Sequence, residues 1–167
     1  MFGRPAGLVF LLSLVLAAMA LNQAGGELPE RVASHFGITG AADGWSSRSS
    51  FLTVVGAVIA GTSLLLVGIG WLLPRLPFSL VSIPHPDYWL APERRAGSWL
   101  LIQDFLLAVA AATNLFFVLL LRETVIANRL PQPHLGAGFW LIMAAYAALL
   151  AAGTIRWLRG WRLPRRG

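Results

Sequence analysis

Four long apolar runs divide this chain, and they constrain its fold more than any other feature. They cover residues 6–21, 51–73, 98–121 and 136–155. A helix needs about 20 mostly apolar residues to cross the hydrocarbon core of a bilayer. Backbone groups in lipid must bond to one another, so each run is predicted to be a helix. We therefore expect an all-α integral membrane four-helix bundle, with residues 1–167 as a single membrane domain.

The composition agrees with a lipid environment. Hydrophobic residues make up 57% of the chain and charged residues only 12%, which lies outside the range of globular domains. Cysteine is absent, which excludes disulfides and thiolate chemistry. The net charge of +6 comes from arginines that mostly flank the apolar runs. No basic helix or recognition motif accompanies them, so we expect the lipid bilayer, and no nucleic acid, as a partner.

The arginines predict an orientation. Only Arg31, Arg48, Arg122 and Arg129 lie on one side of the expected membrane, and the other nine of the thirteen lie on the opposite side. The positive-inside rule then places both termini and the loop at 74–97 in the cytoplasm, and the loop at 22–50 outside. The arginines and tryptophans of residues 156–166 predict an interfacial tail, which Pro164 ends.

The first run has two interpretations. It follows Arg4 and ends in Ala18-Met19-Ala20, a pattern that fits a signal peptide with a small-residue cleavage site. The apolar stretch is longer than the typical signal-peptide core of about 7 to 15 residues, so we favour a retained helix. Cleavage would leave three spans with the same orientation.

Polar residues inside the third run predict a face directed into the bundle. Gln103 and Asn114 lie about three helical turns apart and so share an angular position, with Asp104 beside Gln103. Phe105 and Phe116 are expected on the lipid side. This polar face motivates one alternative function, a small transporter or channel component.

Asp104 lies in the expected apolar layer, where an ionised carboxylate has a high free-energy cost unless it is paired or functional. It is either a proton, ion or ligand site, or a structural residue that is protonated or paired with Arg94 or Arg95. Small residues predict helix contacts elsewhere: Gly56, Ala60 and Ser63 in the second run, and the alanines of 144–152 in the fourth. We expect both stripes to be buried, either within the bundle or in a homo-oligomer.

The outer loop contains LPERVASHFG from Leu28 to Gly37, then Gly40, then DGWSSR from Asp43 to Arg48. Pro29 and the four-residue spacing of Leu28, Val32 and Phe36 predict a short helix on the membrane surface.

The sequence Asp43-Gly44 predicts a tight turn that presents Trp45 to the interface and brings Asp43 toward His35. This pair orders the loop, recognises a partner or, with Glu30, binds a metal. No nucleophile or metal motif accompanies it, so we expect neither an enzyme nor a cofactor.

The second loop contains IPHPDYWLAPERR from Ile83 to Arg95. Its prolines predict an extended, braced segment, and Pro92 is expected to start the third helix. The loop either anchors the chain at the interface or docks a cytoplasmic partner, and its charged residues are expected to pair with one another or with lipid phosphates. Its candidate functional residues are Asp87, Tyr88, Trp89, Glu93, Arg94 and Arg95.

These two loops, from Leu28 to Arg95, resemble the domain of unknown function found in SdpI-like bacterial membrane proteins. The resemblance implies a bacterial inner-membrane protein without enzymatic activity, which senses or resists an envelope or extracellular factor or partners another membrane protein. The best-known member of that family is an immunity protein that protects its producer from a secreted peptide toxin and sequesters a transcriptional repressor at the membrane.

Overall fold

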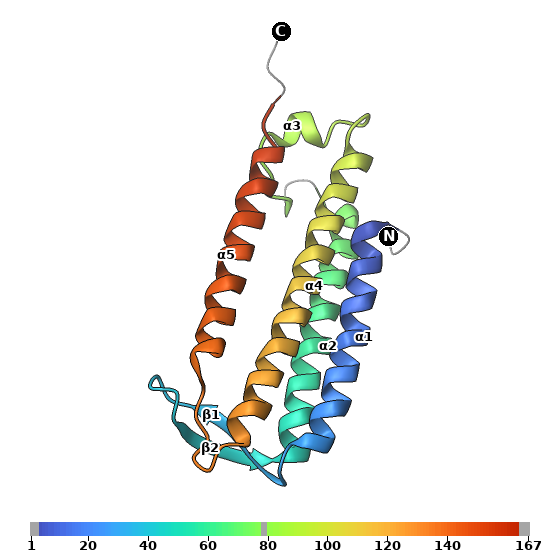
Figure 1. The fold of residues 1–167 in the computed structure, drawn as a ribbon. Helices are drawn as coiled ribbons and strands as arrows, with labels where there is room; N and C mark the ends of the chain where they lie inside the picture. Colours follow the sequence, from blue (N-terminus) through green and yellow to red (C-terminus); the bar gives the residue numbers. More distant parts are fainter. Residues whose placement is uncertain (1–3, 78–79, 164–167) are drawn as a thin grey trace.

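Four long helices form the molecule in the computed structural model, which describes residues 4–77 and 80–163 (Figure 1). Each is long and apolar enough to cross a membrane, so the predicted all-α four-helix membrane bundle is confirmed. Each helix extends beyond its expected run at one end or at both, because polar residues continue it past the apolar stretch. They are α1 (Pro5–Glu27), α2 (Arg48–Leu72), α4 (Arg95–Asn128) and α5 (Ala137–Gly160).

Local sequence explains where two of the helices begin and end. Pro5 occupies the first turn of α1, where its missing N–H costs nothing. Leu28 precedes Pro29 and is extended, as a residue before proline prefers. The hydroxyl of Ser47 accepts a hydrogen bond from the Ser50 amide at 3.1 Å and caps α2. α1 begins and α5 ends at one end of the bundle, here called the terminal end (Figure 1).

Helix α4 is the central element, in contact with α1, α2 and α5. Leu107 is fully buried in a cluster with Ala110 and Ala111 of α4 and Phe10 of α1. Small alanines at this contact let the α1 and α4 backbones approach closely, the packing that stabilises helices in lipid.

Helix α5 differs from the expectation, because none of its described residues is buried. The prediction that its alanine stripe packs inside the bundle is wrong. Phe105 and Phe116 do not face lipid alone: their rings stack on Trp157 and Tyr146 of α5, at 4.6 and 4.1 Å between centroids. These large rings hold α4 and α5 apart, which leaves the alanines exposed. In the α2 stripe Ser63 is buried, whereas Ala60 is exposed.

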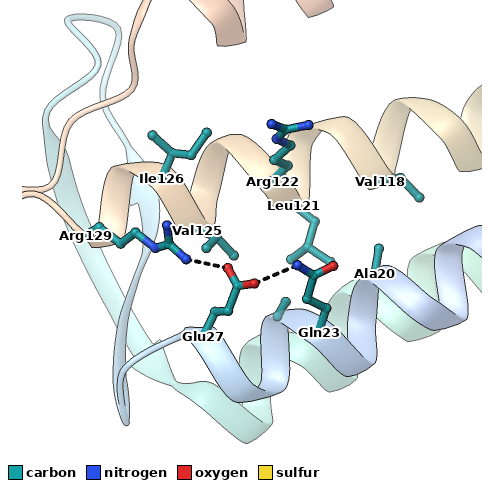
Figure 2. A pocket seen from close by; sticks show the side chains of 10 residues that line it. Ala20, Gln23, Glu27, Val118, Leu121, Arg122, Val125, Ile126 and Arg129 are labelled. Atoms are coloured by element: carbon teal, nitrogen blue, oxygen red, sulfur yellow. Dashed lines mark hydrogen bonds and ion pairs between the residues drawn. The ribbon is translucent and has the colours of Figure 1, made fainter.

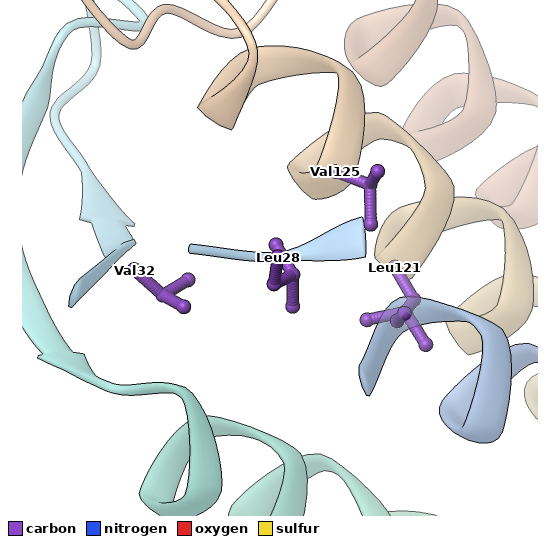
Figure 3. Packing of buried hydrophobic residues seen from close by; sticks show 5 residues of the cluster. Leu28, Val32, Leu121 and Val125 are labelled. Atoms are coloured by element: carbon purple, nitrogen blue, oxygen red, sulfur yellow. The ribbon is translucent and has the colours of Figure 1, made fainter. Parts of the chain in front are cut away.

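The outer loop is a β-hairpin rather than the expected short helix. Strand β1 (Arg31–Phe36) pairs antiparallel with β2 (Ala42–Ser47). Leu28 and Val32 pack into a buried cluster with Leu121 and Val125 of α4 (Figure 3). The four-residue spacing that suggested a helix face is also compatible with one face of a strand, because alternate residues share a face.

A turn that contains Gly40 connects the two strands, and the segment between α4 and α5 binds to this turn. Gly40 has φ +88°, a conformation that side chains with a Cβ rarely adopt. A Cβ there would also lie 2.9 Å from the carbonyl oxygen of Leu135. The Leu135 amide donates to the Gly40 carbonyl at 2.9 Å, so the hairpin is tied to the start of α5. The end of the bundle that carries this hairpin is called the hairpin end.

The second loop crosses the terminal end. The 3₁₀ turn η1 (Leu73–Arg75) follows α2, and the short helix α3 (Pro86–Trp89) precedes α4. α4 begins at Arg95 rather than at Pro92, because residues 91–94 form a turn in which the Arg94 and Arg95 amides both donate to the Ala91 carbonyl. In the expected interfacial tail, α5 continues to Gly160; Pro164, Arg165 and Arg166 lie outside the described residues.

Candidate functional site

The polar face of α4 is directed into the bundle, as predicted. Asn114 is completely buried, and its amide donates to the Ser13 hydroxyl of α1 at 3.1 Å. Its carbonyl oxygen accepts from the Ser63 hydroxyl of α2 at 3.1 Å. Gln103 donates to the carbonyl of Gly70 at 2.9 Å. These side chains therefore bind groups of the chain itself and join three helices.

Asp104 forms an ion pair with Arg4, at 2.5 Å between Nη2 and Oδ2. The expected pairing with Arg94 or Arg95 is wrong. Arg95 lies nine residues earlier on the same helix, about 13 Å along its axis. Arg4, which precedes α1, is brought beside Asp104 by the packing of α1 on α4. Both side chains are partly exposed.

The hairpin brings His35 and Asp43 together, as the sequence predicted. His35 Nδ1 contacts Asp43 Oδ1, and both side chains are largely exposed. Asp43-Gly44 lies within β2 rather than in the hairpin turn. A Cβ on Gly44 would lie 2.9 Å from the Cβ of His35, so glycine permits this close approach.

Glu30 does not join this pair, because it binds Arg48. Within residues 4–77 and 80–163, no three His, Asp or Glu side chains gather closely enough to hold a metal ion. Trp45 is 47% exposed, and the Arg31 guanidinium lies 5.4 Å from the centre of its ring.

A pocket of about 640 Å³ lies between α1 and α4 at the hairpin end (Figure 2). Glu27 organises its polar side: it accepts a hydrogen bond from Gln23 at 2.7 Å and forms an ion pair with Arg129 at 2.8 Å. The lining residues of this α1–α4 pocket are Ala20, Gln23, Ala24, Glu27, Val118, Leu121, Arg122, Val125, Ile126 and Arg129.

Arg122 is the cation in this pocket without a partner among the described residues. It is exposed and lies two helical turns from Arg129, on the same face of α4. In Figure 2 its guanidinium lies on the opposite side of the α4 ribbon from Gln23 and Glu27. A guanidinium presents parallel N–H donors that match a carboxylate or phosphate. The pocket can therefore hold an anionic group at Arg122 and apolar groups on Val118 and Leu121.

The sequence interpretation missed this pocket, because Arg122 and Arg129 were used only to orient the membrane. The signal available was their seven-residue spacing just beyond an apolar run. The sequence does not show that α1, which supplies Gln23 and Glu27, packs beside these arginines, because that contact arises only from tertiary packing.

Asn128 fixes the hairpin to the same end of α4. Its carbonyl oxygen accepts from the Ala33 amide at 2.8 Å, and its amide donates to the Ala33 carbonyl at 3.1 Å. Ala33 is fully buried, so one side chain satisfies both backbone groups of a residue that water cannot reach. The hairpin and the α1–α4 pocket therefore both lie against the same end of α4.

The second loop makes contacts within the chain at the terminal end. The Trp89 indole donates to the carbonyl of Trp161 at 2.9 Å, and the Arg94 guanidinium lies 4.1 Å from the ring centre of Tyr88. Asp87, Glu93 and Arg95 are exposed. Within the described residues no ion pair joins Asp87 to Arg94 or Arg95, so the expected pairing among these charges is wrong, whereas their pairing with lipid phosphates stays a prediction.

The fold defines a multi-span membrane protein. Residues 8–60 match the sequence model of a family described as Domain of unknown function (DUF1648). The matched stretch contains most of α1, the hairpin and the first half of α2. It includes the outer loop, whereas the second loop lies beyond it. No curated protein and no solved structure matched the chain.

Proposed function

We propose that this protein is a non-enzymatic membrane receptor of the SdpI-like type, which binds an envelope or extracellular factor at its hairpin end. In this proposal it resides in the bacterial inner membrane with both termini in the cytoplasm. The observation that carries the proposal is the unpartnered Arg122 on the wall of a pocket of about 640 Å³.

The pocket is suited to a ligand that has an anionic group beside an apolar segment. Arg129 is already paired with Glu27, so the pair is close to neutral and Arg122 supplies the local positive charge. A carboxylate at Arg122 would gain charge-assisted hydrogen bonds. The clamped hairpin and helix ends give a rigid site, which lowers the entropic cost of binding. Immunity to a peptide toxin, the role implied by the resemblance, requires recognition of this kind.

The transporter or channel alternative has less support. Gln103, Asp104 and Asn114, the polar residues that suggested it, each bind another group of the chain. Internal hydrogen bonds of this kind stabilise helix packing in lipid.

The proposed orientation predicts which positions can be labelled from outside. The chain has no cysteine, so a single introduced thiol is the only target. Ile38, at the hairpin turn, is 93% exposed. In intact spheroplasts a membrane-impermeant maleimide should label Ile38→Cys fully, whereas Glu93→Cys should react only after permeabilisation. Labelling of Glu93→Cys from outside would reverse the topology and remove the receptor from the envelope side.

The proposed pocket predicts a crosslinking pattern. A photoreactive amino acid at Ile126, on the exposed rim, should crosslink a factor in native membranes of the producing cells. Arg122→Gln should reduce the crosslinked product about tenfold, as expected for the loss of one charge-assisted hydrogen-bonded contact. Arg159→Gln, an exposed arginine on α5 at the opposite end, is the matched control and should leave the product unchanged. A product that persists in Arg122→Gln would contradict the site.

A further inference from the structure

A second cavity, of about 450 Å³, lies between α1, α4 and α5 near the terminal end. It lies at the opposite end of α4 from the α1–α4 pocket and shares no residue with it. The residues that line this terminal cavity are Ala6, Leu101, Asp104, Phe105, Ala108, Gly153, Arg156, Trp157, Gly160 and Trp161.

Two opposite charges line the terminal cavity, and neither is saturated. Asp104 binds Arg4 through Oδ2, and among the described residues its other carboxylate oxygen has no partner. Arg156 is exposed and forms no ion pair or hydrogen bond within the described part of the chain. The cavity therefore offers a free guanidinium and a carboxylate oxygen to one ligand.

Two buried hydrogen-bond donors at the same end also have no acceptor among the described residues. Nη1 of Arg4 and Nε1 of Trp157 are buried and make no hydrogen bond within the described residues. A buried donor without an acceptor is costly. A ligand rich in acceptor oxygens, entering with a small shift of these side chains, would relieve that cost.

Aromatic residues place this cavity at the lipid headgroup layer. Trp157 stacks on Phe105, and Trp161 packs edge-on against Trp157 at 5.3 Å between centroids. Trp71 lies in the last turn of α2, and Trp89 and Trp99 pack in one cluster with Trp157 and Trp161, so five of the seven tryptophans lie at this end. Indole rings concentrate where hydrocarbon meets headgroups. The cavity thus opens where phospholipid phosphates reside.

We propose that the terminal cavity binds a phospholipid whose headgroup carries a primary ammonium, phosphatidylethanolamine. Its phosphate binds the Arg156 guanidinium, and its ammonium donates to the free oxygen of Asp104. An acyl chain lies along Leu101 and Phe105. A choline headgroup cannot donate to Asp104, because its nitrogen is fully methylated, and a glycerol headgroup carries no cation to pair with the carboxylate. The proposal does not depend on the receptor function proposed for the hairpin end.

The experiment measures lipid retention by the purified full chain. Protein in mild detergent is equilibrated with equal amounts of phosphatidylethanolamine and phosphatidylcholine of identical acyl chains, and bound lipid is counted by native mass spectrometry. We expect phosphatidylethanolamine to be retained about tenfold over phosphatidylcholine, the ratio given by one charge-assisted hydrogen bond. Equal retention of the two lipids would overturn the proposal.

Substitutions test which part of the lipid headgroup each of the two charged side chains binds. Arg156→Gln should lower retention of both lipids about tenfold, and it should fold normally because Arg156 has no partner to lose among residues 4–77 and 80–163. Arg159→Gln, one turn away but outside the cavity, should retain lipid as the wild type does. Asp104→Asn keeps an acceptor but removes the negative charge, so it should reduce the preference for ethanolamine over choline while lipid is still bound. Equal losses in Arg156→Gln and Arg159→Gln would overturn the assignment.

A competition distinguishes the lipid from a soluble phosphate compound. Glycerophosphoethanolamine has the same headgroup without acyl chains. At a hundredfold excess it should not displace the bound lipid, because the apolar lining contributes to retention. Displacement would show that the cavity takes a water-soluble phosphate compound and would overturn the lipid proposal.

Discussion

Replacing Asn114 by alanine should lower the free energy of unfolding by about 2–3 kcal/mol. The side chain is fully buried and joins α1 and α2 to α4 through Ser13 and Ser63. Interhelical hydrogen bonds in membranes contribute about 0.6 kcal/mol on average and up to about 1.7. Two such bonds are lost, and the shorter side chain leaves a cavity whose lining loses contacts.

The measurement is reversible unfolding in mixed micelles with increasing dodecyl sulfate, followed by circular dichroism. Asn22→Ala is the matched control, because Asn22 is the same residue type on the exposed surface of α1; it should change stability by less than about 0.5 kcal/mol. A double-mutant cycle of Asn114→Ala with Ser63→Ala should give a coupling energy above zero. Equal effects of Asn114→Ala and Asn22→Ala would show that the buried network contributes nothing.

The second large effect is expected at Asn128, the residue that clamps the hairpin. Asn128→Ala leaves the buried N–H and C=O of Ala33 without partners, at a cost of about 1–3 kcal/mol for each group. We expect the hairpin to separate from α4 locally while the helices remain folded. Amide hydrogen exchange at Ala33 should then accelerate at least tenfold, since about 1.4 kcal/mol of local stability corresponds to that factor.

Asn128→Asp tests the geometry of the clamp. A carboxylate still accepts from the Ala33 amide but cannot donate to the Ala33 carbonyl. Exchange at Ala33 should therefore lie between the wild-type and Asn128→Ala rates. Unchanged exchange in both variants would mean that the hairpin is held by the Leu28 and Val32 cluster alone.

The sequence was sufficient to predict the spans and the direction of the polar face on α4. Lipid permits few backbone structures, so long apolar runs have one interpretation. Asn114 and Gln103 are costly in lipid, and this cost directs them toward the other helices. Both predictions follow from the properties of lipid as the surrounding medium and do not require knowledge of how the side chains pack.

The hairpin was not predicted, because the spacing of its apolar residues is ambiguous. Leu28, Val32 and Phe36 lie four apart, which suits one side of a helix and one side of a strand equally. The Asp43-Gly44 pair suggested a turn, yet the chain turns at Gly37–Gly40, where φ of Gly40 is positive. Even so, both arrangements bring Asp43 to His35, and that contact is confirmed.

Contacts between distant segments were the least predictable. The partner of Asp104 was sought nearby in the sequence, whereas Arg4 lies one hundred residues away and reaches it only through the packing of α1 on α4. The α1–α4 pocket has the same origin, since its charges come from Glu27 on one helix and from Arg122 and Arg129 on another. Neither pattern is visible along a single helix.

Helix α4 has 34 residues, so it rises about 51 Å, well beyond the roughly 30 Å of hydrocarbon. Its length also exceeds the roughly 40–45 Å of a bilayer with its polar layers, and its two ends carry the hairpin and α3. For the proposed receptor, a factor that adsorbs to the lipid surface first would be concentrated in a thin layer and would search for the pocket in two dimensions. Its partition coefficient into the bilayer then multiplies its apparent affinity for the receptor.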